Sequence, residues 1–188
     1  MPRSIPDEQV LEAAVDVMVN RGYAGATTRQ IARAAGINEV TLFRRFGNKA
    51  KLLRAAVRRE FERFVGDDGI ACTGDVAADL EYVVRSYQSL LLRRGRLIPV
   101  LLAELPRQPD LRDIIEMPLA LFSSVARLIE QYQERCVLGP GSPVAATSAL
   151  LGPLLMPYLF GMSGVMEYES VDPAEHVQAY LRGRELGT

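Results

Sequence analysis

The sequence predicts an all-α protein of about nine helices. Apolar residues recur at the three- and four-residue spacing of a buried helix face along most of the chain. No stretch alternates polar and apolar residues in the way a half-buried strand would. Gly, Pro, Ser, Asn and Asp gather between the periodic stretches, where they start and stop helices. With 188 residues, of which 48% are hydrophobic, the chain is long enough for one or two domains with substantial cores.

The N-terminal part predicts one helix of ordinary length followed by two short ones. Its first helix carries an apolar stripe at Leu11, Ala14, Val15 and Met18 and ends at residues 20–22, which are Asn-Arg-Gly. This helix is expected to cover the back of the two short helices and to complete a three-helix head.

Residues 27–46 read as the two short helices with a tight turn between them. Thr27 and Thr28 can cap the first, and its apolar face is formed by Ile31, Ala34 and Ala35. Gly36 stands where that helix must stop with positive φ. Asn38 can cap the second, whose inward side chains are Leu42 and Phe46, four residues apart. Two capped helices across a glycine turn, the second with exposed arginines, predict a DNA-binding helix-turn-helix.

Residues after the motif predict a long fourth helix that begins after Asn48. Its apolar stripe is Leu53, Val57, Phe61 and Phe64, and its outer side carries Arg54, Arg58, Arg59 and Arg63. Lys49 lies in its first turn, where the helix dipole disfavours a cation. We therefore expect Lys49 to serve an external anion, a DNA phosphate.

The rest of the chain predicts five more helices. They cover residues 76–94, residues 97–105, a stretch from Asp110 to about Cys136 with Pro118 inside it, residues 143–166 and residues 173–184. Ser-Pro and Asp-Pro pairs open the last two, a cap followed by proline in the first helical position.

Charge is divided along the chain. Residues 1–65 hold 12 Lys and Arg against 7 Asp and Glu, a net charge of +5, whereas the remainder carries −6. A basic head on an acidic body is typical of a polyanion-binding domain joined to a second domain.

Neither catalysis nor a cofactor is indicated. The chain has no Gly-rich phosphate loop with lysine, no Gly-x-Ser-x-Gly motif, and a single histidine, His176. Cys72 and Cys136 lie far apart without metal-ligand spacing and are expected to be reduced thiols, with a redox-sensing role as the alternative. The start of the chain lacks the apolar core of a signal peptide, so a cytoplasmic protein is expected.

One segment, residues 144–166, contains no charged residue and is long enough to span a bilayer. Its two prolines and three glycines, and the absence of closely flanking basic clusters, favour instead a helix buried on all sides of a soluble helical body.

Residues 27–53 contain the run Thr-Thr-x-x-Ile-Ala-x-x-Ala-Gly-Ile-Asn-x-x-Thr-Leu-Phe-x-x-Phe-x-Asn-Lys-x-x-Leu-Leu. In this run the chain resembles the tetracycline-repressor (TetR) family of bacterial transcription regulators, whose second short helix usually reads Ser-x-Gly-x-Leu-Tyr-x-His-Phe. Here Asn38, Val40, Phe43 and Arg45 replace Ser, Gly, Tyr and His. The change to Phe43 removes a hydroxyl that donates to a phosphate in relatives, and Arg44 or Arg45 is expected to replace it.

The helix-turn-helix is expected to contact DNA through Thr27, Thr28, Arg29, Asn38, Glu39, Val40, Thr41, Phe43, Arg44, Arg45 and Lys49. Arg44 or Arg45 could bond guanine, Glu39 could accept from cytosine, and Val40 and Thr41 could touch a thymine methyl. Thr27, Thr28 and Lys49 would hold phosphates.

The resemblance further implies two domains. Residues 1–48 form the DNA-binding domain, and residues 49–188 form a domain that binds an effector and dimerises. A cavity for a small apolar effector is expected between the fifth, seventh and eighth helices, with the lining residues Tyr87, Met117, Phe122, Met156, Tyr158, Phe160 and Met162. The last two helices are expected to form a homodimer interface through Leu150, Leu154, Val177, Tyr180 and Leu181.

The resulting prediction is a ligand-responsive regulator, not an enzyme, that represses by binding a palindromic operator as a homodimer and is released by its effector. Two alternatives remain: an activator of the same family, and an adaptor or ligand-binding helical protein that does not regulate through DNA. The exposed arginines and Lys49 favour DNA binding.

Overall fold

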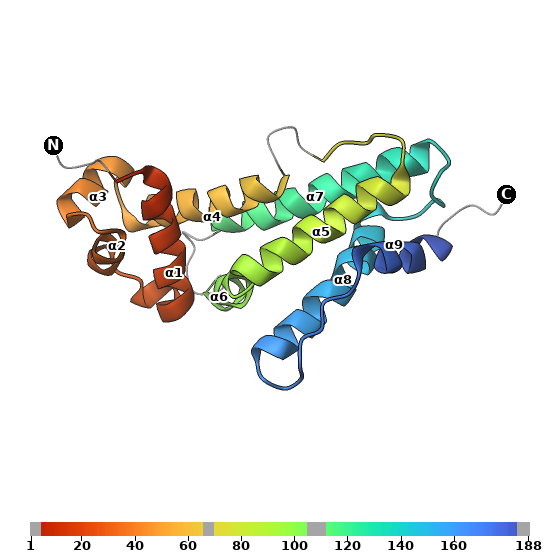
Figure 1. The fold of residues 1–188 in the computed structure, drawn as a ribbon. Helices are drawn as coiled ribbons and strands as arrows, with labels where there is room; N and C mark the ends of the chain where they lie inside the picture. Colours follow the sequence, from red (N-terminus) through yellow and green to blue (C-terminus); the bar gives the residue numbers. More distant parts are fainter. Residues whose placement is uncertain (1–4, 66–69, 105–111, 184–188) are drawn as a thin grey trace. The chain divides into compact units, whose positions relative to one another are not determined.

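The computed structural model describes residues 5–65, 70–104 and 112–183, without the side chains of residues 61, 63–65, 102, 104 and 112–117. The predicted all-α fold is confirmed, with nine helices in this described part (Figure 1). They are α1 (Asp7–Gly25), α2 (Thr28–Ala35), α3 (Glu39–Phe46), α4 (Lys49–Val65), α5 (Val76–Arg94), α6 (Leu97–Glu104), α7 (Arg112–Glu134), α8 (Pro143–Met162) and α9 (Pro173–Arg182).

The chain divides into two compact units that interleave along the sequence. The first comprises residues 1–62 and 96–118, and the second comprises residues 63–95 and 119–188. Helix α4 therefore passes from the first unit into the second near Glu62. The sequence predicts a different boundary, between residues 48 and 49, where the DNA-binding domain ends. That functional boundary remains a prediction, whereas the two units above are defined by contacts between residues.

Helix α1 is the central helix of the first unit, in contact with α2 and α6. Its predicted stripe is confirmed, because Leu11, Ala14, Val15 and Met18 are all buried. The regular helix stops at Gly22, as predicted, because this residue has a φ of 70° and a ψ of 171°. One more helical turn follows to Gly25.

Helices α2 and α3 form the predicted helix-turn-helix. Thr27 caps α2 through a complete capping box with Gln30, and Asn38 caps α3 by accepting from the N–H of Val40. Gly36 ends α2 with a φ of 71°. The apolar face of α2 is Ile31, Ala32 and Ala35, so the prediction of Ala34 as part of that face is wrong: Ala34 is exposed.

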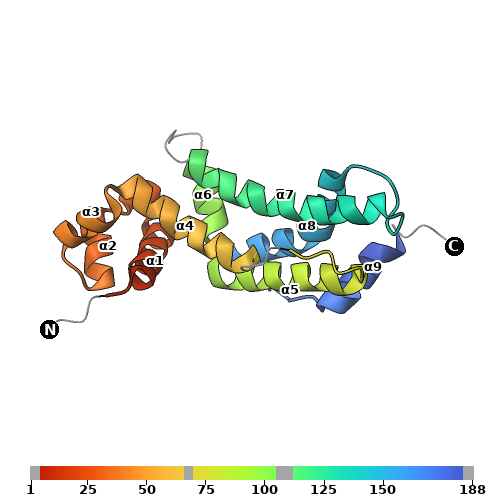
Figure 2. The same ribbon diagram turned by 90° about the horizontal axis from the view of Figure 1, so that it is seen from above.

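The second unit packs α5 against α8 and α9 (Figure 2). The Nε2–H of His176 on α9 donates to the carbonyl of Leu150 on α8 at 2.8 Å, and the Tyr180 hydroxyl donates to the carbonyl of Ala146 at 3.2 Å. Gln88 on α5 donates to the carbonyl of Val171, just before α9, at 2.8 Å. These side-chain to backbone bonds hold three helices together beyond their apolar contacts.

A buried polar cluster stands at the start of α5. Asp79 accepts hydrogen bonds from the Tyr132 hydroxyl at 2.5 Å and from the hydroxyl and N–H of Thr73 at 2.7 and 2.8 Å. Tyr132, on α7, is fully buried, and its oxygen accepts from the N–H of Gly74. Burial, followed by the hydrogen bond to Asp79, raises the pKa of Tyr132 above its usual value. The phenol therefore stays protonated and remains a donor at neutral pH.

Helix α7 ends in a turn that normally requires glycine. The N–H of Val137 reaches the carbonyl of Tyr132 and the N–H of Cys136 reaches that of Gln133, the two bonds of a Schellman motif. Cys136 occupies the left-handed position with a φ of 56°. Helix α2 ends in the same pair of bonds, with Gly36 in the equivalent position.

Cys136→Gly is therefore expected to stabilise the protein by about 0.5–1 kcal/mol, because glycine adopts positive φ without the clash of a Cβ atom. Gly36→Ala, at the matched position of α2, should lower the free energy of unfolding by about 1 kcal/mol. Urea unfolding monitored by circular dichroism measures both. A loss of stability in Cys136→Gly would contradict the role given to this turn.

Helix α8 is the helix within the described ranges whose length and composition would suffice to cross a membrane, and 33% of its most apolar window is buried inside the chain. Its buried residues form one stripe: Ala146, Thr147, Leu150, Leu151, Leu154 and Tyr158. The single chain buries only this side of α8, because Val144, Met156 and Phe160 are exposed; burial on all sides would need a partner subunit and stays a prediction.

Candidate nucleic-acid interface

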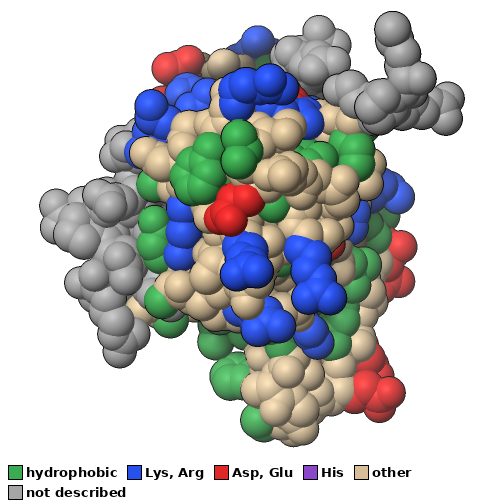
Figure 3. Space-filling view, turned by 90° about the vertical axis from the view of Figure 1, so that its left-hand side faces the viewer, with side chains coloured by type: hydrophobic (Ala, Val, Ile, Leu, Met, Phe, Trp, Pro, Cys, Tyr) green, Lys and Arg blue, Asp and Glu red, His purple; other side chains and the backbone are tan. Residues whose placement is uncertain are grey.

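Helix α3 presents an exposed face of mixed character. Val40 is 74% exposed and Phe43 44% exposed, which is unusual for large apolar side chains on a helix of a folded unit. Arg44 is exposed beside them, while Leu42 on the opposite side is fully buried. Figure 3 shows the side that carries α2 and α3, where hydrophobic side chains lie next to an acidic one and Lys and Arg side chains surround them. Such a surface can touch base edges and methyl groups while cations attract phosphates.

Helix α2 adds polar and cationic groups to this surface. Thr27 and Arg29 are exposed at its start. The hydroxyl oxygen of Thr27 caps α2 by accepting from the N–H of Gln30 at 3.2 Å, and its hydroxyl proton can still be donated to another group. Arg33 is exposed in the last turn of α2, and it is not among the residues that the sequence predicted to contact DNA.

Thr28 and Glu39 contact each other, which the sequence did not predict. The Thr28 hydroxyl donates to a carboxylate oxygen of Glu39 at 2.6 Å, joining the first residues of α2 and α3. The Thr28 hydroxyl proton is thus engaged within the protein, and its predicted contact with a phosphate stays a prediction.

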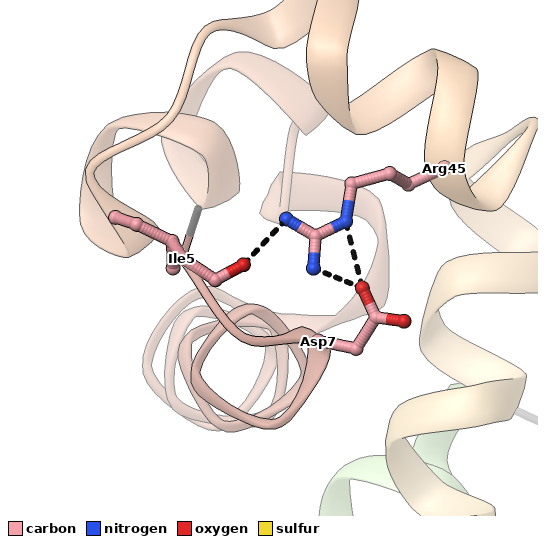
Figure 4. Close-up of polar contacts among 3 residues, drawn as sticks. All are labelled: Ile5, Asp7 and Arg45. Atoms are coloured by element: carbon pink, nitrogen blue, oxygen red, sulfur yellow. Dashed lines mark hydrogen bonds and ion pairs between the residues drawn. The ribbon is translucent and has the colours of Figure 1, made fainter. Parts of the chain in front are cut away.

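Arg45 is engaged within the protein as well (Figure 4). Its Nε–H donates to the Asp7 carboxylate at 2.7 Å, a terminal N–H donates to the same oxygen, and the other donates to the carbonyl of Ile5 at 2.8 Å. Of the two arginines predicted to read guanine, Arg44 is thus the one whose guanidinium is exposed.

Lys49 also has partners within the protein. Its ammonium donates to the carbonyl of Tyr23, lies 3.4 Å from the carbonyl of Ala24, and stands 4.4 Å from the centroid of the Tyr23 ring. The cation therefore satisfies carbonyls at the end of α1, which gives its position an internal reason besides the predicted phosphate contact. No sequence pattern links residues 23 and 49.

The predicted effector-lining residues fall into two groups. Tyr87 and Tyr158 are buried in the second unit, and burial raises the pKa of Tyr87 to about 12. An added Cβ at Gly95 would lie 2.3 Å from Cε1 of Tyr158, so glycine at the end of α5 admits this ring. In contrast, Met156, Phe160 and Met162 are exposed and cannot line an interior cavity of the single chain, Phe122 is half-buried, and the side chain of Met117 lies outside the described residues.

The predicted dimer residues belong to the second unit. Leu150, Leu154, Val177, Tyr180 and Leu181 are all buried inside the chain, where they pack α8 and α9 within the second unit. They are therefore core residues of the single chain. The sequence correctly placed an apolar face on each helix, but could not tell which side of α8 faces its own chain, because both sides are apolar.

Two grooves in the described parts contain none of the predicted lining residues. One, of about 460 Å³, lies in the second unit beside Gln133, Ser142 and Tyr180. The other, of about 550 Å³, lies in the first unit between α1 and α4 and is lined by Lys51, Arg54, Arg58 and Arg59 together with Leu11 and Glu62. Among the described residues, no group of three or more His, Cys, Asp and Glu side chains could hold a metal ion.

A capped helix-turn-helix with an exposed, cation-flanked second helix defines a DNA-binding transcription regulator. Comparison with known proteins identifies the family. Residues 10–56 match the family model for bacterial regulatory proteins of the tetR family. These residues form a DNA-binding domain of the TetR type, and the curated relatives of the chain are transcription regulators.

Curated relatives agree with this family. The chain is 25% identical over 175 residues, 93% of its length and 77% of the relative's, to the uncharacterized HTH-type regulator YvkB of Bacillus subtilis. It is 35% identical over 65 residues to the HTH-type activator FasR of Mycolicibacterium smegmatis, covering 35% of this chain and 30% of FasR. It is 33% identical over 66 residues to the HTH-type repressor AcnR of Corynebacterium efficiens, covering 34% of this chain and 35% of AcnR.

A solved structure extends the likeness of fold to nearly the whole chain. It is a TetR-family regulator from Mesorhizobium loti, with a TM-score of 0.71 at 23% identity, covering 96% of each chain.

Proposed function

We propose that the chain binds a palindromic operator as a homodimer and represses transcription there, with α3 in the major groove as the recognition helix. The observation that carries this proposal is the exposed face of α3, where Val40, Phe43 and Arg44 are open to solvent. One such helix reads too few bases for strong discrimination, so two are needed, about 34–36 Å apart on successive turns of DNA.

Dimerisation is supported by the side of α8 that its own chain leaves uncovered. Val144, Met156 and Phe160 are exposed there, and small exposed residues lie between them: Ala145, Ser148 and Ala149. On α9, Gln178 and Ala179 are exposed beside the buried stripe. Small residues let two helices approach closely, and the exposed apolar residues gain from burial.

The effector is proposed to be an apolar or amphipathic small molecule that binds the second unit. Buried aromatic residues such as Tyr87 and Tyr158 suit such a ligand. Binding would favour a state in which the recognition helices are spaced wrongly for the operator, and DNA must weaken effector binding by the same factor. An activator remains the alternative, since FasR and AcnR match this chain about equally well.

Because its proposed partner is DNA, we propose that the protein acts in the cytoplasm. An adaptor function without DNA is the second alternative, and the arginines on the α2–α3 surface argue against it.

The test is binding of the purified protein to duplex DNA from immediately upstream of its own gene, measured by fluorescence anisotropy with random DNA as competitor. The proposal predicts binding at least about a thousandfold tighter than to random DNA, two protomers per duplex, and an affinity that falls steeply with salt. Binding that salt and sequence do not affect would contradict it.

A further inference from the structure

Helix α3 has few apolar contacts to fix its orientation. It is eight residues long, and Leu42 is its one fully buried residue. Isolated helices of this length are unstable in water, so its orientation depends on tertiary contacts. A recognition helix that pivots by a few degrees moves its base-reading side chains away from their partners, so contacts that fix its angle also fix its specificity.

Side-chain hydrogen bonds connect both ends of α3 to other helices of the first unit. At its start, Glu39 accepts from Thr28 of α2 at 2.6 Å. In its last turn, Arg45 binds the carboxylate of Asp7 and the carbonyl of Ile5, at the start of α1 (Figure 4). The two attachments lie about two helical turns apart, so together they restrain rotation of α3 as well as its distance from the neighbouring helices.

The geometry at Arg45 leaves little of the guanidinium for DNA. All three of its nitrogens donate to Asp7 or Ile5, and the side chain is 21% exposed. The ring of Phe46 lies 5.7 Å from its central carbon and limits its movement on another side. A planar guanidinium with three fixed donors can direct two N–H groups to one carboxylate oxygen and a third to a carbonyl, which a lysine cannot do.

We propose that Arg45 is a positioning residue, which sets the angle of the recognition helix by tying it to Asp7 and Ile5 and does not itself contact DNA. The inference rests on the proposed function of α3, but its structural part can be tested without DNA. In this arrangement Arg44 reads bases and Arg45, its neighbour in sequence, holds the helix in place.

The first test is amide hydrogen exchange of the full chain. Asp7→Ala and Arg45→Ala should each speed exchange in α3 about fivefold or more, because each releases the same attachment. The matched control is Glu8→Ala, which removes a 2.6 Å ion pair between α1 and Arg59 of α4 that does not involve α3. Unchanged exchange of α3 in Asp7→Ala and Arg45→Ala would overturn the proposal, whether or not an operator is known.

The second test is a double-mutant cycle on operator affinity. Asp7→Ala and Arg45→Ala should each weaken binding by about fivefold or more, and the double variant should be no worse than either single variant. The salt slope should stay at the wild-type value, because no phosphate contact is lost. Glu8→Ala should bind as the wild type does.

A direct DNA contact by Arg45 gives the opposite pattern. Asp7→Ala would then leave affinity unchanged or raise it by freeing the guanidinium, while Arg45→Ala would lower the salt slope of the dimer by about two, one per protomer. Either result would overturn the positioning role. If the wild type itself showed no specific DNA binding, the proposed function would fail while the exchange experiment would still decide the role of Arg45.

Discussion

Arg44→Ala is expected to abolish most of the discrimination between operator and random DNA. A good bidentate contact from arginine to guanine is worth about 1–3 kcal/mol, and a homodimer makes it in both half-sites, so about 2–6 kcal/mol of specific binding is lost. This corresponds to a weakening from about 30-fold to 10⁴-fold. Binding to random DNA should change far less, because it depends on phosphate contacts.

The matched control for Arg44→Ala is Arg85→Ala. Arg85 is an arginine of α5 whose side chain is 67% exposed and pairs with Glu81, so the same charge is removed outside the helix-turn-helix. Fluorescence anisotropy with operator and random duplexes measures both variants. If the two variants weakened operator binding equally, Arg44 would act through net charge alone and its assignment as the base-reading residue would be wrong.

Asp79→Ala is expected to lower the free energy of unfolding by about 3 kcal/mol. The substitution leaves the Tyr132 hydroxyl without its acceptor in a fully buried position and removes the acceptor of Thr73. Each buried polar group left without a partner costs about 1–3 kcal/mol. Because the raised pKa of Tyr132 keeps this phenol protonated, the effect should be constant from neutral pH to about pH 10, where tyrosines of the unfolded chain begin to ionise.

The matched control is Asp75→Ala, which removes an exposed N-cap of the same helix. Asp75 accepts from the N–H of Ala78 at 3.0 Å, and its loss should cost about 1 kcal/mol. Urea unfolding at pH 7 compares the two variants. An Asp79→Ala variant no less stable than Asp75→Ala would show that the buried cluster contributes nothing beyond capping.

Local features of the fold could be predicted from the sequence because each depends on neighbouring residues. Gly36, the cap at Asn38 and the cap at Thr27 act within a few residues of their own position, and the structure confirms all three. The turn at Cys136 was missed because a cysteine gives no sign of positive φ. The buried apolar stripe on α1 could also be predicted, because it follows from the helical period alone.

The sequence could predict which surface is proposed to bind DNA, but not which of its side chains are available to make the contacts. Which side chain remains available for DNA depends on partners far away in sequence: Asp7 for Arg45, and Tyr23 for Lys49. The choice between the two apolar sides of α8 likewise depends on where α5 and α9 pack, which no period in α8 encodes. For this reason the predicted dimer residues are core residues in the single chain, and the dimer contact is proposed instead for exposed neighbours such as Ala149 and Met156.

The central claim, that α3 reads DNA through Arg44 on a helix held by Arg45, is tested most directly by selecting binding sites from a random duplex library. The wild type should enrich an inverted repeat with half-sites about one helical turn apart, containing a guanine whose enrichment disappears with Arg44→Ala. With Arg45→Ala, the same motif should be enriched more weakly. A wild-type selection that yields no motif, or a motif unchanged by Arg44→Ala, would contradict the account.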